Sequence, residues 1–412
     1  MIRSEIIVGL DIGTTKVCTI VGEFAAEGRI DVLGVGMAPS TGLRKGIVVD
    51  IDSTVRAIKQ SVRQAERMGG VHIGSVYLGV TGDHIASLNS RGVVAIAEGE
   101  KEITDAHVQR ATEAARVVVL PPDRRILHNI PRTFVVDGQE GVRHPVGMAA
   151  QRLEVETHVV TGAAMLVENV VRSAGQAGLT VEEVVLEPIA AGLAVVTEAE
   201  KAIGCLLADI GGGTTDLAIY AGGGLYHTAA LPVGGNHVTY DLCVGLRVPP
   251  QRGEQIKKEH GAALTDWVLD DEFVEVQRLG DAEPKELPRR LIAEIIEPRM
   301  EQLFTLVREE IFRVGMEDSV PAGLILSGGG AQLYGAAEMA QRVLQMPVRV
   351  GRPRNVGALA DAVNDSIYAT AVGLVQYGAG KQAAVYRAAA NGHLVSGLLE
   401  RVSRWLLRLA RR

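Results

Sequence analysis

The sequence is poor in cysteine and aromatic residues, and it lacks a long apolar run. Its 412 residues contain three cysteines, Cys18, Cys205 and Cys243, which are widely spaced and follow no metal-ligand pattern. This usage predicts free thiols in a reducing cytosol rather than a disulfide framework. No apolar stretch approaches the roughly 18 residues that a spanning helix needs, and the N-terminal apolar run is too short for a signal peptide. We therefore expect a cytoplasmic protein that does not cross a membrane.

An excess of positive charge is missing as well. The formal net charge is −7, whereas a nucleic-acid-binding protein needs a basic face toward the phosphates. We therefore expect no nucleic-acid partner. The hydrophobic share of 47% and the charged share of 22% are those of an ordinary globular protein, and the length allows two or more domains.

Several common site motifs are also absent. The chain has no G-x-x-x-x-G-K-[ST], no G-x-G-x-x-G after a strand, no G-x-S-x-G and no H-E-x-x-H. Its ten histidines form no ligand-like cluster. The P-loop, dinucleotide-binding, serine-hydrolase and zinc-peptidase classes are therefore excluded.

Apolar runs separated by turn residues predict an α/β chain in which strands and helices alternate. The predicted strands are 6–12, 17–22, 75–80, 126–136, two within 204–222, and 324–327. The predicted helices are 53–68, 100–116, 162–177, 187–200, 289–313, with a possible kink at Pro298, and 331–345. The stretch 378–393 is rich in alanine and glycine, which predicts a linker.

One short motif occurs twice. Asp-Ile-Gly-Thr-Thr at 11–15 returns as Asp-Ile-Gly-Gly-Gly-Thr-Thr-Asp at 209–216, and each copy lies between two apolar strands. Glycine lets backbone N–H groups approach an anion closely, and threonine hydroxyls add donors. The aspartates can hold Mg²⁺ through water, and Lys16 can place a charge on the outer phosphates. One copy would favour a simple chain reversal, but two matching copies predict a shared phosphate site in a fold of two similar halves.

A third glycine-rich segment extends this prediction. The apolar strand at 324–327 runs into three glycines at 328–330 that open a helix. Backbone without side chains can lie flat against a base or a sugar. A tight strand–helix turn would explain the glycines if they stood alone, but together with the two phosphate turns they predict the nucleoside end of the same site.

Five motifs, taken in chain order, resemble the five-part signature of actin, heat-shock chaperones and sugar kinases. They are at 11–16, 187–191, 209–216, 327–330 and 369–373. The intervening segments resemble the FtsA family of bacterial cell-division proteins; they are 42–52, 77–94, 124–148, 152–162 and 253–261. The resemblance covers essentially the whole chain. It implies an actin-like ATPase fold, with two RNase H-like halves around a nucleotide cleft and a small subdomain inserted in the first half. It also implies ATP and Mg²⁺ as cofactors, with at most slow hydrolysis.

The resemblance carries residue roles to matching positions. It assigns the first phosphate loop to Asp11, Gly13, Thr14, Thr15 and Lys16. It assigns the second to Asp209, Gly211, Gly212, Gly213, Thr214, Thr215 and Asp216. It makes Glu187, Asp11 and Asp209 the candidate catalytic residues, with Glu187 near the attacking water and the two aspartates on Mg²⁺ through water. Without the resemblance, Glu187 could equally be a helix-capping charge.

The nucleoside end is assigned in the same way. The resemblance places Glu254 and Lys257 beside the ribose and the adenine, and Gly328, Gly329 and Gly330 beneath the base. The spacing of Glu254 and Lys257 alone slightly favours an ordinary i,i+3 surface pair.

The resemblance further implies a division into subdomains. The first half would comprise 1–81, 161–190 and 360–380, with the insertion at 82–160. The second half would comprise 191–239 and 316–359. The segment 240–315 would form a further subdomain that contacts the adenosine and binds the C-terminal peptide of FtsZ. Arg299 is the candidate contact for that acidic peptide, and the family also implies actin-like self-association and other division partners.

The C-terminal segment 394–412 is amphipathic at helical spacing. One arc carries apolar side chains, among them Leu398, Leu399, Val402, Trp405, Leu406 and Leu409. Five arginines and one glutamate give the segment a net side-chain charge of +4, so that the rest of the chain carries −11. Packing on the protein's own body is the commoner use of such a helix, but the basic charge and the tryptophan favour a helix lying on an anionic membrane surface. We therefore expect a peripheral membrane protein, and the resemblance implies that it lies on the inner face of the cell membrane at the division site.

Three other functions fit the signature. A heat-shock chaperone would be expected to continue past the nucleotide domain into a β-rich substrate domain. A sugar kinase shares the fold but has no use for a basic amphipathic tail. An actin-like adaptor of pilus assembly is the nearer alternative, and it would be expected to lack the terminal helix and the segment 147–156.

Overall fold

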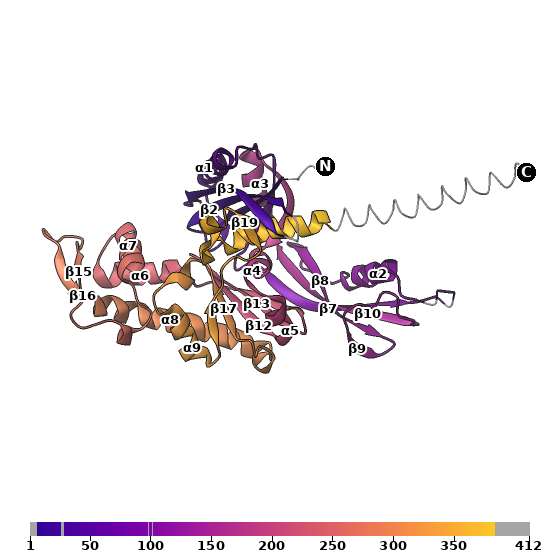
Figure 1. Ribbon diagram of the computed structural model, residues 1–412. Coiled ribbons are helices and arrows are strands. Elements are labelled where there is room, and N and C mark those ends of the chain that lie inside the picture. Colours follow the sequence, from indigo (N-terminus) through magenta and orange to yellow (C-terminus); the bar gives the residue numbers. More distant parts are fainter. Residues whose placement is uncertain (1–5, 26–28, 98, 101, 384–412) are drawn as a thin grey trace, which may run out of the picture.

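The computed structural model describes residues 6–25, 29–97, 99–100 and 102–383. Two sheets with matching topology form the body, a third sheet projects from one side, and a helical region lies at the opposite end (Figure 1). The predicted membrane helix 394–412, and residues 384–393 of the predicted linker, lie outside the described residues.

The first half is built on a six-stranded sheet. Its strand order is β11-β6-β1-β2-β3-β19. The strands are β1 Ile6–Ile12, β2 Lys16–Phe24, β3 Ile30–Pro39, β6 Ser75–Val80, β11 Thr180–Leu186 and β19 Val356–Ala358. A short hairpin follows β3, made of β4 Leu43–Arg44 and β5 Ile47–Val48. Helices α1 Ile51–Gly69 and α3 Ala164–Gln176 lie together against this half (Figure 1). The nearly continuous apolar runs of β1 and β2 suit strands that are buried on both faces.

The second half repeats this plan with five strands in the order β14-β13-β12-β17-β18. They are β12 Cys205–Ile210, β13 Thr215–Ala221, β14 Gly224–Leu231, β17 Leu324–Ser327 and β18 Val348–Val350. Both halves therefore begin with an antiparallel hairpin, β1–β2 and β12–β13, whose turn contains one copy of the repeated motif.

Two helices join the halves. They are α4 Glu187–Val195 and the helix 369–383, and their alanines and valines share one buried cluster with β1, β2, β12 and β13. Backbone crosses closely there, since a Cβ added at Gly373 would overlap the Ala190 carbonyl. The helix 369–383 corrects the predicted linker, because residues 378–383 are helical. Their small side chains serve close packing, as Gly378 lies directly against the Tyr77 ring.

The inserted sheet has the order β7-β10-β8-β9. Its elements are β7 Ala86–Ala95, α2 Asp105–Ala115, β8 Arg124–Val136, β9 Gln139–Val142 and β10 Arg152–Ala163. Helix α2 packs on β7 and β10 around a small core of its own. The sheet docks against β14, the edge strand of the second half.

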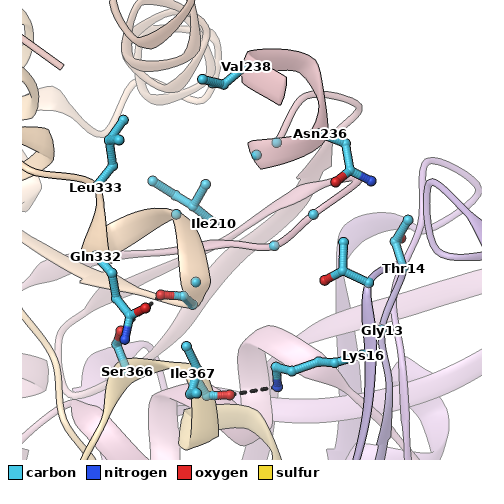
Figure 2. A pocket seen from close by; sticks show the side chains of 18 of the residues that line it. Gly13, Thr14, Lys16, Ile210, Asn236, Val238, Gln332, Leu333, Ser366 and Ile367 are labelled. Carbon is cyan, nitrogen blue, oxygen red and sulfur yellow. Dashed lines mark hydrogen bonds between the residues drawn. The ribbon is translucent and has the colours of Figure 1, made fainter. Parts of the chain in front are cut away.

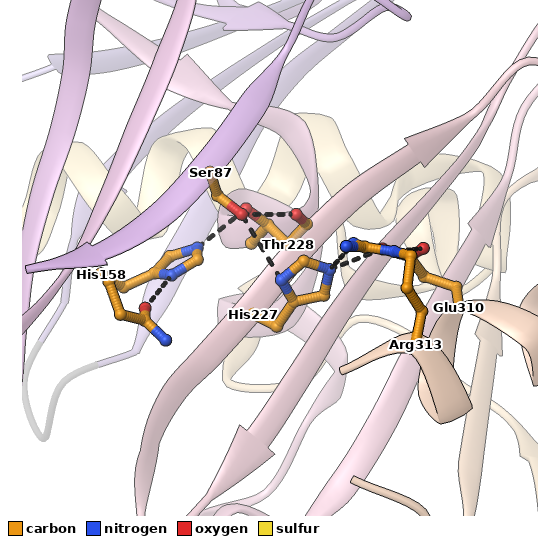
Figure 3. A network of polar contacts seen from close by, with 7 residues as sticks. Ser87, His158, His227, Thr228, Glu310 and Arg313 are labelled. Atoms are coloured by element: carbon orange, nitrogen blue, oxygen red, sulfur yellow. Dashed lines mark hydrogen bonds and ion pairs between the residues drawn. The ribbon is translucent and has the colours of Figure 1, made fainter. Parts of the chain in front are cut away.

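A buried polar network fastens this docking (Figure 3). His158 of β10 is fully buried; its Nδ1 donates to Asn89 Oδ1 over 2.9 Å and its Nε2 accepts from the Thr228 hydroxyl of β14 over 3.0 Å. Burial and, to a lesser extent, the neighbouring His227 lower the pKa of His158 to about 3, so the ring is neutral. Ser87 of β7 donates to the Thr228 carbonyl over 2.9 Å. The contact between the inserted sheet and the second half is therefore hydrogen-bonded rather than only apolar.

The remaining helices form the end of the second half opposite the insertion. They are α6 Gly235–Leu246, α7 Pro250–His260, α8 Arg289–Arg313 and α9 Ala336–Leu344, with a hairpin of β15 Phe273–Val276 and β16 Lys285–Pro288. Helix α8 supplies the centre of their core through Ile296, Leu303 and Phe304. The prediction of a helix over 289–313 is confirmed, with Pro298 inside it.

Three other predicted helices differ from those observed. The segment 187–200 is two helices, α4 and α5 Glu198–Ile203, because Thr197 and Glu200 form a capping box that starts a new helix. Helix α2 begins at Asp105 rather than at 100. The segment 331–345 contains only α9, which is preceded by a short 3₁₀ turn and by Gly335 at φ 78°. Within the described residues, no helix has both the length and the apolar character needed to cross a membrane.

Candidate functional site

The two copies of the repeated motif form the same turn. Gly13 N–H donates to the Lys16 carbonyl over 2.9 Å, and Gly211 N–H donates to the Thr214 carbonyl over 2.9 Å. The turns face each other so closely that a Cβ added at Gly212 would overlap the Thr15 side chain. One added at Gly213 would lie 2.7 Å from Thr14 Oγ1. The glycines are therefore needed for the approach of two turns that are about 200 residues apart in the chain.

A cleft of about 950 Å³ opens between the two halves, and both turns line it (Figure 2). Most of the residues assigned from the sequence line this one cavity. They are Asp11, Gly13, Thr14, Thr15, Lys16, Glu187, Asp209, Gly211, Gly212, Thr214, Asp216, Glu254, Lys257, Gly328, Gly329 and Gly330. Two of the assigned loop residues, Gly213 and Thr215, are not among those that line the cleft. The Thr215 hydroxyl donates to the Val233 carbonyl over 2.8 Å.

Acidic groups gather at one end of the cleft. Asp11 and Asp209 lie near the ends of β1 and β12, and Asp216 lies opposite Asp209 on β13. Burial raises the pKa of Asp209 to about 6, although the Thr370 hydroxyl donates to its carboxylate over 2.8 Å. Burial likewise raises the pKa of Asp216 to about 7, against a hydrogen bond from Thr81. These carboxyl groups therefore change charge near neutral pH.

Lys16 is the cation of this end. Its ammonium lies 3.3 Å from Asp11 Oδ2 and donates to the Ile367 carbonyl over 2.7 Å (Figure 2). Burial, the largest single influence, lowers the pKa of Lys16, but Asp11, Cys18 and Asp209 together raise this pKa above its ordinary value. Lys16 is therefore charged, and it points into the cleft from the same turn as Thr14.

Glu187 is the first residue of α4 and is buried at the floor of the cleft. Its Oε1 has no hydrogen-bond partner, which is uncommon for a buried carboxyl oxygen. Burial raises the pKa of Glu187 well above its ordinary value, and the charges of Asp11 and Asp216 raise it further. An orphaned carboxyl oxygen beside two other acids is a candidate ligand or proton acceptor.

The other end of the cleft is apolar with a polar rim. Val238, Met300 and Leu303 line it, and the Gly328 backbone has φ 78°. Lys257 Nζ lies 2.6 Å from Glu254 Oε2, and both side chains bond to the Thr239 hydroxyl. A base and a ribose need this combination of an apolar slot and fixed polar groups.

Several lining residues were not singled out from the sequence. They are Thr81, Asn236, Gln332, Ser366, Ile367 and Thr370. Thr370 lies in the motif 369–373, but nothing in the neighbouring sequence indicates that its hydroxyl contacts Asp209. The others come from remote segments whose composition is ordinary, so only the fold brings them to the cleft. Among the described residues, no group of three or more His, Cys, Asp or Glu is arranged to hold a metal ion directly.

Arg299 lies outside the cleft, on α8. Its Nε lies 2.6 Å from Asp241 Oδ2 and its Nη2 lies 3.0 Å from Oδ1, so a carboxylate of α6 already holds the guanidinium in two places. Tyr240 and Val244, one turn apart on α6, are 68% and 60% exposed. The surface around Arg299 therefore combines a paired cation with exposed apolar side chains.

Solved structures with the same arrangement define the class of protein. One is the PilM–PilN type IV pilus biogenesis complex, with a TM-score of 0.65 and 17% identity over 90% of this chain and 98% of that chain. Another is MreB 5 of Spiroplasma citri bound to AMPPNP, with a TM-score of 0.53 and 15% identity over 95% and 99%. Two hairpin turns facing each other across a cleft, in two similar halves, make this a protein of the actin-like ATPase fold.

The sequence comparisons narrow this class. The family model "Cell division protein FtsA" matches residues 206–373, and "SHS2 domain inserted in FTSA" matches residues 82–161, the inserted sheet. The cell division protein FtsA of Pseudomonas aeruginosa is 44% identical over 98% of this chain and 97% of that protein. The chain belongs to the FtsA family of cell division proteins. Membership of this family favours neither the pilus adaptor nor the sugar kinase that the sequence had left open.

Proposed function

We propose that this protein binds Mg-ATP in the cleft and tethers the FtsZ ring to the inner face of the cell membrane. The observation that carries the nucleotide site is the pair of facing turns with the same internal hydrogen bond at the acidic end of a cleft of about 950 Å³. Membership of the cell-division family carries the expected partner and location.

The residues present fit a triphosphate with Mg²⁺. Gly13, Gly211 and Gly212 line the cleft without side chains, so the turns can offer backbone N–H groups to the phosphates. Asp11 and Asp209 would hold the cation through its water, as Mg²⁺ prefers few direct protein ligands beside phosphates. When bound, the ion would neutralise phosphate charge and polarise the phosphoryl group.

Two side chains of the cleft, those of Lys16 and Glu187, would act on the phosphates and on the attacking water. Lys16 would exchange its contact with the Ile367 carbonyl for a phosphate oxygen. Glu187 would orient a water molecule at its orphaned Oε1 and accept its proton. Burial and the neighbouring carboxylates raise the pKa of Glu187 well above its ordinary value, which disfavours the base form that this step needs. We therefore expect at most slow hydrolysis.

The nucleoside would lie toward α7 and α8. Glu254 and Lys257 would contact the ribose and the adenine edge, and the backbone of Gly328, Gly329 and Gly330 would lie beneath the base. The apolar side chains of Met300 and Leu303 make this end suitable for a stacked ring.

The acidic C-terminal peptide of FtsZ would bind on the surface formed by α6 and α8. Tyr240 and Val244 would bury against its apolar residues. Arg299 would share its guanidinium between Asp241 and a peptide carboxylate, because an arginine has five N–H donors. The segment 394–412 would lie in the headgroup plane of an anionic membrane, and copies of the protein would associate as actin-like filaments there.

The test is recruitment of cognate FtsZ to anionic liposomes. We expect FtsZ to sediment with liposomes only when this protein and ATP are present. FtsZ without its C-terminal peptide should stay in the supernatant. Recruitment of the shortened FtsZ at the same level would contradict the tethering proposal.

A further inference from the structure

His128 of β8 makes a contact that leaves the inserted sheet. The side chain is buried, and its Nε2 accepts a hydrogen bond from Leu186 N–H over 3.0 Å. Leu186 ends β11 and is the N-cap residue of α4. The next residue is Glu187, whose carboxyl group lies at the floor of the cleft.

The start of α4 follows the pairing of Leu186 with Val80 of β6 and has no side-chain cap, so the contact with His128 adds an acceptor there. The first backbone N–H groups of a helix have no partner within it and need a cap or another acceptor. Leu186 offers no capping side chain, and Pro188 has no N–H to donate. The imidazole of His128 therefore supplies an acceptor to the backbone directly before Glu187.

The protonation state of His128 suits this role. Burial lowers the pKa of His128 to about 4; the charge of Glu183 opposes this shift, whereas that of Lys381 adds to it. The ring is therefore neutral near pH 7, with the proton on Nδ1 and the lone pair on Nε2. The Tyr377 ring packs edge-on against the imidazole of His128, with 6.3 Å between the two ring centroids.

The inserted sheet that carries His128 is itself fastened at two other places. The network of His158 and Thr228 docks it on β14 (Figure 3). Thr81, directly before the insertion, donates to Asp216 in the cleft. The position of β8 relative to α4 is therefore set by the docking of the whole subdomain.

We propose that His128 is a positioning residue for Glu187, through which the docked inserted subdomain holds the acidic end of the cleft in its working geometry. This inference rests on the proposed nucleotide site. It implies that anything that moves the inserted subdomain, such as a partner bound to it, changes the environment of Glu187.

The test compares three substitutions in the full-length protein. His128→Phe keeps a flat ring but removes the acceptor, whereas His128→Gln places an amide oxygen near the position of Nε2. His107→Phe is the matched control, because His107 is a buried histidine of the same subdomain that contacts Thr104 and Glu100 rather than α4. The measurements are ATP affinity by calorimetry, single-turnover hydrolysis, and the titration of Glu187 by carboxyl ¹³C NMR, assigned with Glu187→Gln.

In His128→Phe, we expect Glu187 to relax away from Asp11 and Asp216, so that its titration midpoint falls toward the ordinary range. Hydrolysis should slow by about tenfold while the Kd for ATP changes less than about twofold, because the base and not the binding surface is displaced. His128→Gln should restore both readouts, and His107→Phe should leave both unchanged.

An unchanged Glu187 midpoint in His128→Phe, or an equal shift in His107→Phe, would overturn the inference. If His128→Phe does not fold, His128→Asn replaces it, since its shorter amide cannot reach Leu186 N–H. If the wild-type protein binds no ATP, the proposed function fails, whereas the titration of Glu187 without nucleotide still decides the role of His128.

Discussion

At the scale of single residues, the acidic end of the cleft is unfavourable in the free protein. Glu187, Asp209 and Asp216 are buried close together, and burial raises the pKa of each carboxyl group. Such shifts gather at functional sites, where a ligand supplies the missing charge. A cation with bound phosphates would supply it here, whereas Lys16 alone faces four carboxyl groups including that of Asp11.

This crowding predicts a pH dependence of binding. The pKa of Asp209 is about 6 and that of Asp216 about 7, so both carboxylates ionise as the pH rises from 5.5 to 8. Since Mg²⁺ binds the ionised form, the affinity for Mg-ATP should rise by at least about tenfold over this range. Calorimetry at both pH values measures the change. Asp209→Asn should bind more weakly and show a smaller dependence.

The same pKa shifts predict that the free protein becomes less stable as the pH rises, whereas its affinity for Mg-ATP increases. A carboxyl group with a raised pKa in the folded state contributes stability below its unfolded pKa and loses it as the pH rises through the folded value. Thermal unfolding of the nucleotide-free protein should therefore show a loss of stability between about pH 4 and pH 7 that is smaller in Asp209→Asn. An equal loss in the variant would contradict this origin.

The turn glycines give a further prediction. Gly212→Val should reduce ATP affinity by at least about tenfold, ~1.4 kcal/mol, because the new side chain would force the two turns apart at Thr15. Gly74→Val is the control, since a Cβ at Gly74 meets nothing within 4 Å. Circular dichroism should show both variants folded. Equal ATP affinity in Gly212→Val and the wild type would argue against phosphate binding between the turns.

At the scale of elements, the sequence predicted what local signals specify. The hairpin at 6–22 and the helix at 289–313 have strong apolar patterns and clear limits, and both are confirmed. Helices α6 and α7 were not predicted, because both contain glycine and α7 also begins with a proline, and these residues usually mark turns. The prediction of a linker was wrong for residues 378–383, which are helical, since small residues also occur where backbones pack closely.

The candidate site divides in the same way. The repeated turns and the glycines at 328–330 have motifs, so sequence alone predicted that they belong together, and they line one cleft. The contacts of Thr81, Ser366 and His128 are made by single residues on remote elements. Their positions depend on how whole subdomains dock, and no local pattern encodes this.

The C-terminal segment is an element whose function can be tested directly. We expect 394–412 to bind anionic liposomes, with Trp405 and its apolar neighbours inserted and each arginine adding about 1 kcal/mol at the surface. In Trp267→Phe, the fluorescence of Trp405 should shift to the blue when liposomes are added. High salt should weaken binding without abolishing it, because the apolar contribution is not screened.

Leu399→Glu with Leu406→Glu should release the protein from liposomes while ATP binding stays intact. A protein truncated after His393 should behave in the same way. If the truncated protein still floats with liposomes, another part of the chain is the anchor.

At the scale of the whole molecule, two sheets meet around one cleft and a third sheet is attached beside them. The two halves contribute one turn each, α4 and the helix 369–383 cross between them, and the inserted sheet bonds to both the second half and the start of α4. A ligand that spans the two turns therefore fixes the relative position of the halves. The insertion and the α6–α8 region lie at opposite ends of the molecule (Figure 1).

This link between nucleotide and shape predicts filaments that depend on ATP. Two different ends that fit each other make a head-to-tail contact, and such a contact gives an open filament unless its rotation closes a ring. ATP should favour one relative position of the halves, so that every copy presents the same ends to the next. Electron microscopy on an anionic lipid monolayer should show protofilaments with ATP. Gly212→Val should give few or none at the same surface density, and Gly74→Val should match the wild type. Isolated monomers across all nucleotides and concentrations would contradict self-association, whereas equal filaments in Gly212→Val would show that assembly does not need the nucleotide.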